Sequence, residues 1–250
     1  MMNPAEFANI AESEAKFWWY RGMREIMFGL LDPIARRRTL GPVLEAGCGT
    51  GHFARELERR YRWRMHSLDL GMEGLRFARG YGLGRLVQAD IRALPYRAQA
   101  FDAVVSMDVI VHLRRGEESL PLAEFARVLR PGGLLALRVS ALDILRSRHS
   151  MHAMERQRFT RGRLISAVRA QGFEVERVTY ANSLLMPVAL AKFRLWEPLT
   201  GQAADSGVKP VAPWLDALLH APLAAEARWI GAGLGFVTGQ SLILLANRLS

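Results

Sequence analysis

The hydrophobic positions of this chain form short buried runs separated by amphipathic stretches, the pattern of a sheet covered by helices. The first clear run, residues 43–46, is apolar except for an acid, and three glycines follow it at alternate positions. Residues 52–59 then have helical periodicity. This stretch predicts a buried strand, a tight turn, and a helix whose N-terminus faces the turn. Because glycine has no Cβ, a ligand can lie against the bare backbone of such a turn.

The same pattern predicts further strands and helices along the chain. Residues 63–69 alternate and end in an aspartate, whereas residues 101–113 form a near-continuous apolar run, as is typical of a central parallel strand. A helix over 117–130 is stopped by Pro131-Gly132-Gly133. The remaining predicted strands are 85–91, 134–139, 173–180 and 241–246, the remaining helices are 13–38 (one or two), 160–171 and 213–230, and residues 201–213 are predicted to be a loop.

Two classes of ligand fit a glycine turn between a strand and a helix. A dinucleotide site requires Gly-x-Gly-x-x-Gly, which places the pyrophosphate on the helix N-terminus. Counted from Gly47, the third glycine of that motif would stand where the chain has His52, and the pattern is instead Glu45-x-Gly47-x-Gly49-x-Gly51. The acid would repel a pyrophosphate but attract a cationic ligand. A nicotinamide-dependent dehydrogenase is therefore a weak alternative.

This motif resembles the first motif of class I S-adenosylmethionine (SAM)-dependent methyltransferases. In that family the glycine turn lies beside the amino-acid moiety and ribose, and the acid lies near the positive methionyl end. The resemblance extends from about residue 17 to the end of the chain, with its motifs in the expected order. It implies SAM as cofactor and S-adenosylhomocysteine as product. The fold it implies is α/β, a doubly wound seven-stranded mixed sheet (Rossmann-like methyltransferase fold) with an antiparallel final strand.

The resemblance also implies cofactor contacts at the ends of the predicted strands. Asp69 would accept hydrogen bonds from both ribose hydroxyls, as acids at this place do in dinucleotide folds. Asp90 would accept from the adenine amine while Ile91 packs on the ring, and Met107 would contact the cofactor with Asp108 or His112 facing the transfer site. The full set of expected cofactor contacts is Tyr20, Arg21, Glu45, Gly47, Gly49, Gly51, Asp69, Leu70, Asp90, Ile91, Met107 and Asp108.

An aromatic and basic segment, residues 17–24, precedes the first strand. Aromatic faces attract a sulfonium cation, and an arginine can bind a carboxylate. Packing of a helix on the sheet accounts equally well for the aromatic side chains. Since the family has a similar segment that closes over the cofactor, we interpret it as a lid in which Tyr20 and Arg21 contact the cofactor, with Arg24 as the second choice.

Three histidines are candidates for a general base, because histidine can take a proton near neutral pH. His112 ends the apolar run 101–113, while His149 and His152 lie in the polar connection 140–160 that would border the ligand crevice. A solvated loop or a local hydrogen bond is the alternative role for each histidine. Ubiquinone-pathway O-methyltransferases carry a Glu-x-x-Glu-His metal cluster at the place of residues 108–112. Here Val111 stands where that cluster has its second carboxylate, so no metal is expected.

We expect a single domain over residues 1–250, divided into an N-terminal helical lid (1–40), a core (41–182), a helical cap insertion (183–232) and the last strand (233–250). In the family such an insertion commonly roofs the acceptor pocket. The predicted function is methyl transfer from SAM to a small-molecule acceptor, apolar or aromatic, at O or N in preference to C. The alternatives are a non-catalytic SAM-binding module and a peripheral-membrane or RNA methyltransferase.

Composition changes the picture at three points. The net charge of +10 fits an anion-binding patch or an arginine-rich solvated surface. Because the chain has no RNA-binding motif, no nucleic-acid partner is expected. Peripheral membrane contact stays an open alternative. The single Cys48 excludes an intramolecular disulfide and, with no N-terminal signal pattern, favours a cytoplasmic protein. Residues 229–247 lack charge, but their glycines favour a loop and strand over a spanning helix. The oligomeric state does not follow from the sequence.

Overall fold

The computed structural model describes residues 4–200 and 211–250 and contains a seven-stranded sheet in the order β3-β2-β1-β4-β5-β7-β6. Strand β7 runs antiparallel to its neighbours β5 and β6, and the other neighbouring strands pair in parallel. The predicted doubly wound mixed sheet is therefore confirmed. The strands are β1 (Pro42–Ala46), β2 (Arg64–Asp69), β3 (Leu86–Gln88), β4 (Phe101–Met107), β5 (Leu129–Ser140), β6 (Phe173–Ala181) and β7 (Ser241–Arg248).

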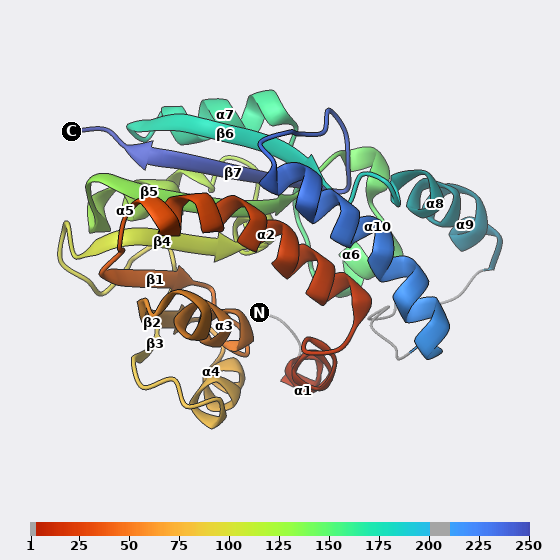
Figure 1. The fold of residues 1–250 in the computed structure, drawn as a ribbon, viewed down its shortest axis with the longest axis horizontal. Helices are drawn as coiled ribbons and strands as arrows, with labels where there is room; N and C mark the ends of the chain where they lie inside the picture. The colour runs from red at the N-terminus through yellow and green to blue at the C-terminus, as the bar shows by residue number, and fades with distance from the viewer. Residues whose placement is uncertain (1–3, 201–210) are drawn as a thin grey trace.

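Helices cover both faces of the sheet (Figure 1). One face packs against α2 (Trp18–Arg37), α3 (His52–Tyr61) and α10 (Pro213–Gly231), and the other packs against α5 (Ser119–Val128) and α7 (Arg161–Arg169). Each face has its own cluster of buried apolar side chains. The shorter elements are α1 (Pro4–Ser13), α4 (Met72–Gly80), α6 (Arg148–His152), α8 (Met186–Ala191), α9 (Glu197–Thr200), the 3-10 turns Ile110–His112 and Asp143–Leu145, and the π-helical turn Lys192–Trp196.

Burial on both faces of the sheet explains why the central strands have uninterrupted apolar sequences. Ala103, Val104 and Val105 of β4 are fully buried, because helices cover both sides of the sheet at this position. The chain order reverses between β1 and β4, which pair directly. The loops that follow these two strands therefore diverge, and doubly wound sheets bind their ligands in the crevice that this creates.

Several boundaries differ from the sequence predictions. Strand β5 begins at Leu129 because Pro131-Gly132-Gly133 continues the strand with a shift in its register to β4. The apolar run 101–113 leaves the sheet at Met107, since Asp108 adopts a left-handed backbone conformation with φ of 56°. The polar connection 140–160 contains α6.

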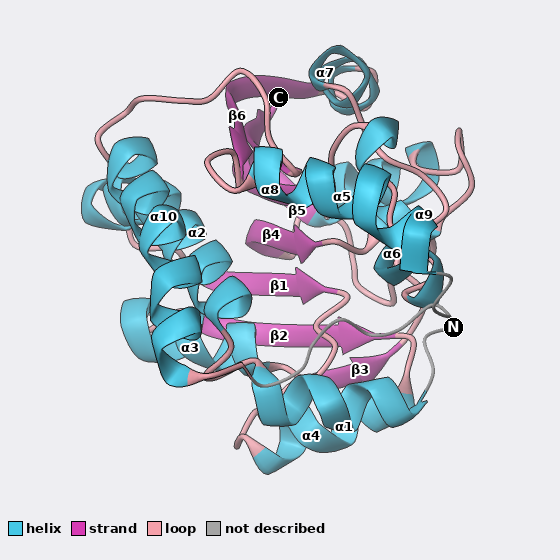
Figure 2. Cartoon of the chain, turned by 90° about the vertical axis from the view of Figure 1, so that its right-hand side faces the viewer, coloured by secondary structure: helices cyan, strands magenta, loops and turns pink. Residues whose placement is uncertain are grey.

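The insertion predicted as a cap consists of two different parts. Helix α10 lies along α2 on the face of the sheet (Figure 1), with Leu223 and Ile230 fully buried, so this part belongs to the core. The other part, residues 186–200, lies at the carboxyl ends of the strands (Figure 2). Residues 201–210 of the predicted loop lie outside the described residues.

The uncharged segment 229–247 does not form a membrane-spanning helix in the structure. This segment is divided between the end of α10, a connecting loop and most of β7. Among the residues that the structure describes, no helix is long and apolar enough to cross a membrane. The interpretation of this segment as loop and strand is therefore confirmed.

Candidate functional site

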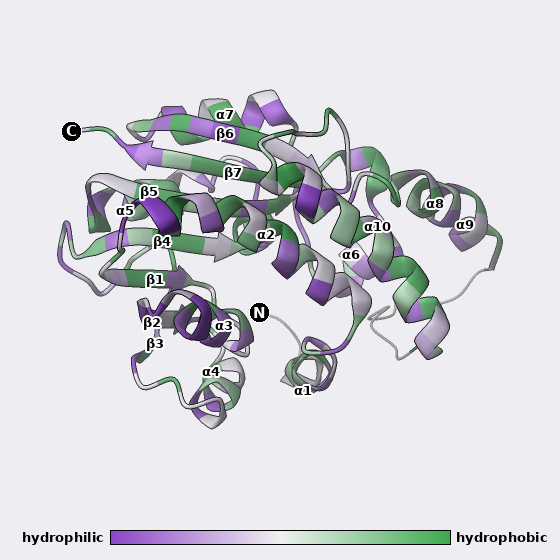
Figure 3. Cartoon of the chain, viewed as in Figure 1, coloured by the Kyte–Doolittle hydropathy of each residue, from purple (hydrophilic) through white to green (hydrophobic). Residues whose placement is uncertain are grey.

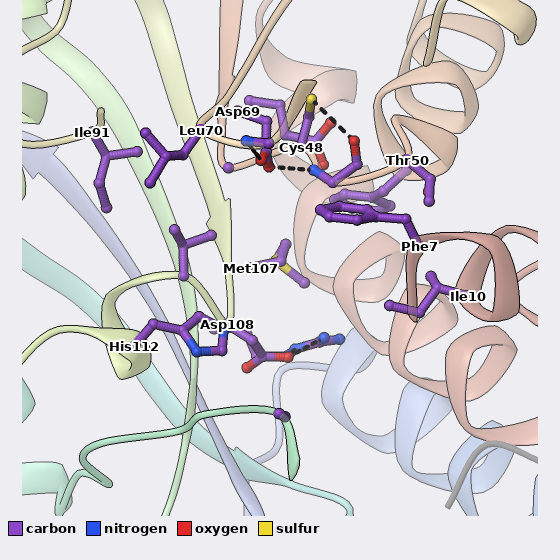
Figure 4. A pocket seen from close by; sticks show the side chains of 18 of the residues that line it. Phe7, Ile10, Cys48, Thr50, Asp69, Leu70, Ile91, Met107, Asp108 and His112 are labelled. Atoms are coloured by element: carbon purple, nitrogen blue, oxygen red, sulfur yellow. Dashed lines mark hydrogen bonds and ion pairs between the residues drawn. The ribbon is translucent and has the colours of Figure 1, made fainter. Parts of the chain in front are cut away.

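A cavity of about 680 Å³ opens at the carboxyl ends of β1, β2 and β4. Its volume is in the range of cofactor sites, and its place is the crevice where the chain order reverses. Figure 4 shows side chains that follow these strands, together with side chains from α1, pointing into the cavity.

Gly49 is the point at which the turn after β1 is open to the cavity. Its φ is 54°, and a Cβ built on it would meet no atom within 4 Å. Gly47 and Gly51 also have positive φ, but a Cβ there would come within 2.3 Å of Val109 and 2.6 Å of Ala78, respectively. These two glycines thus allow close packing of the turn, whereas Gly49 borders open space. Gly51 does not line the cavity, contrary to the prediction that it contacts the ligand.

Asp69, the last residue of β2, holds this turn in place. Its Oδ2 accepts a hydrogen bond from the Gly49 N–H at 2.7 Å, and its Oδ1 accepts one from the Gly71 N–H at 2.7 Å (Figure 4). Burial raises the pKa of the Asp69 carboxyl, against the opposing effect of these two N–H donors. Each carboxylate oxygen keeps a further lone pair, so the group can also accept from ligand hydroxyls.

Two buried carboxyl groups, Glu14 and Glu45, and the partly buried Asp69 line one end of the cavity. Burial, followed by the charge of Glu14, raises the pKa of Glu45 well above its usual range, and Glu45 Oε2 is buried without a hydrogen bond in the described part of the chain. Burial also raises the pKa of Glu14 to about 7, although the Thr50 hydroxyl lies 2.5 and 2.7 Å from its two oxygens. Carboxylates crowded in this way are stabilised by a cation. This end of the cavity therefore fits a ligand with a cationic group.

Helix α1 closes the same end of the cavity, which the sequence analysis did not anticipate. Phe7 and Ile10 line the cavity, and Glu14, just after the helix, reaches Thr50 and also lies 3.3 Å from the Tyr81 hydroxyl. The sequence signal was weak, because these three residues share an i, i+3, i+7 spacing within an otherwise mixed and polar stretch.

We expect the thermal stability of the ligand-free protein to fall between about pH 5 and pH 8, and Glu14→Gln to make this fall smaller, with Glu45 and Asp69, whose pKa values are also raised, contributing to the remainder. The pKa of Glu14 is raised from 4.5 to about 7, so the folded state holds this proton more tightly than the unfolded state. The resulting stabilisation is complete below the unfolded pKa and is lost as the pH rises through about 7. It amounts to at most about 3 kcal/mol.

Scanning calorimetry at a series of pH values measures this effect. Glu12→Gln is the matched control, because Glu12 is an exposed carboxylate two residues earlier, in the last turn of α1. Glu12→Gln should keep the wild-type pH dependence. If Glu14→Gln keeps it as well, Glu14 is not the titrating group.

The predicted lid segment contributes Tyr20 to the cavity but not Arg21. The Arg21 Nη2 lies 2.7 Å from Asp216 Oδ2, so this ion pair joins α2 to α10 and holds the guanidinium away from the site. The predicted cofactor contact by Arg21 is therefore replaced by a structural contact. Arg24, the second choice, does line the cavity, and its Nη1 donates to the Glu14 carbonyl oxygen at 3.0 Å.

Asp90, Ile91 and Leu70 line another part of the cavity, as expected from their order in the sequence. Both oxygens of Asp90 accept hydrogen bonds from the Arg92 guanidinium, which lowers the pKa of this carboxyl. Leu70 is exposed toward the cavity and Ile91 lies on the same side (Figure 4). Two apolar side chains beside a carboxylate can hold a flat ring that carries an amine.

The end of the cavity beyond Met107 is lined by Asp108 and Arg138. The Arg138 Nε donates to Asp108 Oδ2 at 2.8 Å, its Nη2 donates to the same oxygen, and its guanidinium lies over the Trp19 ring at 5.0 Å from the centroid. The other oxygen, Asp108 Oδ1, is buried and accepts no hydrogen bond within residues 4–200 and 211–250. Asp108 therefore keeps an acceptor for a hydroxyl or amine in the cavity.

The structure separates the three candidate histidines. His112 and His149 line the cavity, whereas His152, on α6, does not. The His112 Nδ1 lies 3.3 Å from the Met154 carbonyl oxygen, and because a carbonyl only accepts, this nitrogen carries the proton. The His112 Nε2 is then a proton acceptor. No group of three or more His, Cys, Asp or Glu side chains in the described ranges is placed to hold a metal ion.

Comparison with known proteins agrees with this geometry. The family described as "Methyltransferase domain" matches residues 44–137. The chain is 35% identical over 170 residues to the fatty-acid O-methyltransferase of Mycolicibacterium smegmatis, covering 64% of this chain and 60% of the relative. It is 36% identical over 104 residues to the "Probable tRNA methyltransferase 9B" of Mus musculus, covering 40% of this chain and 22% of the relative.

A solved structure extends the likeness over most of the fold. The [4+2]-cyclase SpnF matches with a TM-score of 0.56 at 25% identity, covering 88% of this chain and 80% of that one. The two curated relatives are matched over only 22% and 60% of their own length. Their names, moreover, give different acceptors, a fatty acid and a tRNA, so the relatives alone do not identify the acceptor.

Proposed function

The chain belongs to the class I SAM-dependent methyltransferases, and on this premise we propose that it transfers a methyl group from SAM to an O or N atom of a small, largely apolar or aromatic acceptor. The observation that carries the proposal is the division of one cavity into two ends. One end has bare backbone and buried carboxylates, and the other has aromatic and basic side chains with the unpaired Asp108 Oδ1. The first suits a cationic nucleoside, and the second suits its acceptor.

The residues of the first end are of the types that SAM requires. Bound SAM supplies an electrophilic methyl group on a sulfonium sulfur. Asp69 would accept from the ribose hydroxyls, and Gly49 would leave room for the ligand beside the backbone. Glu45 and Glu14 would bind the ammonium group, which would relieve the mutual repulsion of these carboxyl groups.

The residues of the second end would orient the acceptor. Asp108 Oδ1 is placed to accept from a hydroxyl or amine, and His112 Nε2 can take the proton that an oxygen nucleophile loses. Trp19, Tyr20 and Met107 offer apolar contacts to the body of the acceptor. Holding the nucleophile in line with the methyl group supplies most of the rate in such reactions.

A SAM-binding module without methyl-transfer activity is the second candidate, because a protein with this fold is titled as a cyclase, which names a reaction other than methyl transfer. The two are distinguished by incubating the purified protein with SAM and a set of carboxylic acids, phenols and amines. Mass spectrometry would detect S-adenosylhomocysteine and a methylated product. Tight SAM binding with no acceptor-dependent S-adenosylhomocysteine would favour the module.

We expect His112→Ala to reduce kcat about 100-fold while the Kd for SAM stays close to the wild-type value. The substitution removes the proton acceptor at the acceptor end and leaves all three carboxyl groups of the other end in place. His152→Ala is the matched control, since its side chain does not line the cavity, and it should retain most of the activity. Steady-state turnover assays give kcat, and calorimetry gives the Kd for SAM. Unchanged turnover in His112→Ala would remove this residue from the mechanism.

A further inference from the structure

Residues 186–200 form a continuous helical segment that buries none of its described side chains. It consists of α8, the π-helical turn Lys192–Trp196 and α9. Val188, Leu195, Trp196 and Leu199 are 63%, 66%, 66% and 83% exposed. Figure 3 shows the hydrophobic residues of this segment at the outer edge of the molecule. Apolar side chains gathered in this way on a surface indicate an interaction site.

Hydrogen bonds hold this segment beside the mouth of the cavity. The Arg194 Nε donates to the Ile144 carbonyl oxygen at 2.8 Å, and the Arg148 N–H donates to Glu197 Oε2 at 3.0 Å. Figure 2 looks onto this end of the molecule, where α6, α8 and α9 lie at the carboxyl ends of the strands. The same stretch of chain as α6 carries Met154, which is half-exposed and lines the cavity.

The apolar surface therefore continues from the helical segment to the cavity opening. We call this surface the mouth face and define it by its exposed apolar side chains, which are Ile144, Met151, Met154, Val188, Leu195, Trp196 and Leu199.

The charges around the mouth face are mainly positive. Residues 143–156 and 186–200 contain five arginines and lysines against three carboxylates. Glu155 is buried against Arg158, which lies outside these two ranges. Asp143 lies 3.6 Å from Arg146, and Glu197 Oε2 accepts a hydrogen bond from the Arg148 backbone N–H, so each of the three carboxylates has a partner within the fold. Exposed tryptophan and leucine next to lysine and arginine are typical of helices that lie in the headgroup region of a membrane.

We propose that the mouth face docks on an anionic lipid bilayer, with residues 186–200 lying in the headgroup region. The further step, in which an apolar acceptor enters the cavity directly from the bilayer, rests on the proposed function; the docking does not. A second copy of the chain would also cover apolar side chains. Pairing two identical faces would, however, bring two positive surfaces together, which opposes that arrangement.

Vesicle flotation tests the docking with the full chain. The wild-type protein should float with vesicles of phosphatidylcholine mixed with phosphatidylglycerol, and much less with phosphatidylcholine alone. The double variant Trp196→Ser/Leu199→Ser should bind the anionic vesicles at least about tenfold more weakly, because two apolar side chains no longer enter the lipid. Lys192→Glu should weaken binding to the anionic vesicles only.

Leu249→Ser is the matched control, because Leu249 is also 50% exposed but lies by the C-terminus at the opposite end of the molecule (Figure 1). It should bind vesicles like the wild type. Equal binding of Leu249→Ser and the double variant, or no binding of the wild type to anionic vesicles, would overturn the proposal. A wild-type dimer in sedimentation that the double variant makes monomeric would also overturn it, in favour of a second copy.

Calorimetry with SAM on the same samples keeps the two proposals separate. The double variant should bind SAM with wild-type affinity, because neither residue lines the cavity. Vesicle binding without SAM binding would contradict the proposed function and leave the docking intact. SAM-dependent methyl transfer without vesicle binding would contradict the docking and leave the proposed function intact.

Discussion

Gly49→Val is expected to weaken SAM binding at least about 100-fold in calorimetry, a loss of about 2.7 kcal/mol, while the protein stays folded. A Cβ at this position meets no protein atom within 4 Å, so the valine side chain would project into the space proposed for the ligand. Its φ of 54° adds backbone strain, which a β-branched residue tolerates poorly.

Gly82→Val separates these two effects. Gly82 also has a positive φ, 88°, and open space around its Cβ position, but it does not line the cavity. Both variants should therefore lose similar thermal stability, and only Gly49→Val should lose affinity for SAM. Equal SAM affinity in the two variants would show that the space beside Gly49 is not the ligand site.

Asp69→Ala is expected to reduce SAM affinity by a similar factor, at least about 100-fold. The carboxylate would accept from the ligand, and it also accepts from the backbone N–H groups of Gly49 and Gly71. Its removal would take away the proposed ribose contact and leave two buried donors unpaired, so the turn would lose its support. Asp69→Asn, which keeps one carbonyl acceptor, should have an intermediate affinity.

Asp102→Ala provides the matched control for this substitution. Asp102 Oδ2 accepts from the Gly41 N–H at 2.5 Å, so this aspartate also ties a strand to a glycine, but at the other end of the sheet. Its loss should lower the melting temperature without changing the Kd for SAM. A melting shift in Asp69→Ala with unchanged SAM affinity would reduce Asp69 to the same purely structural role.

Much of the fold followed from local sequence patterns. The strand–turn–helix unit around Gly49 depends on residues adjacent in the chain, and the order of Asp69 and Asp90 follows the order of the strands that they end or follow. Once the sheet is parallel, the ends of β1, β2 and β4 meet at one edge. The structure accordingly places most of the predicted contact residues around one cavity.

The contacts that the sequence analysis missed join side chains distant in the sequence. Arg21 was expected at the cofactor, but Asp216, 195 residues later, pairs with it. Asp108 shares one carboxylate oxygen with Arg138 from the next strand, which leaves the other oxygen for the cavity. No pattern within either segment indicates these partners.

The sequence by itself determined the sheet, its glycine turn and the acids that line its carboxyl edge, because periodicity and turn residues act over a few positions. Only the tertiary structure decided that α1 closes the cavity, that α10 belongs to the core and that residues 186–200 remain exposed beside the opening. Which apolar surface is covered depends on where distant helices pack, and this is settled by the whole fold.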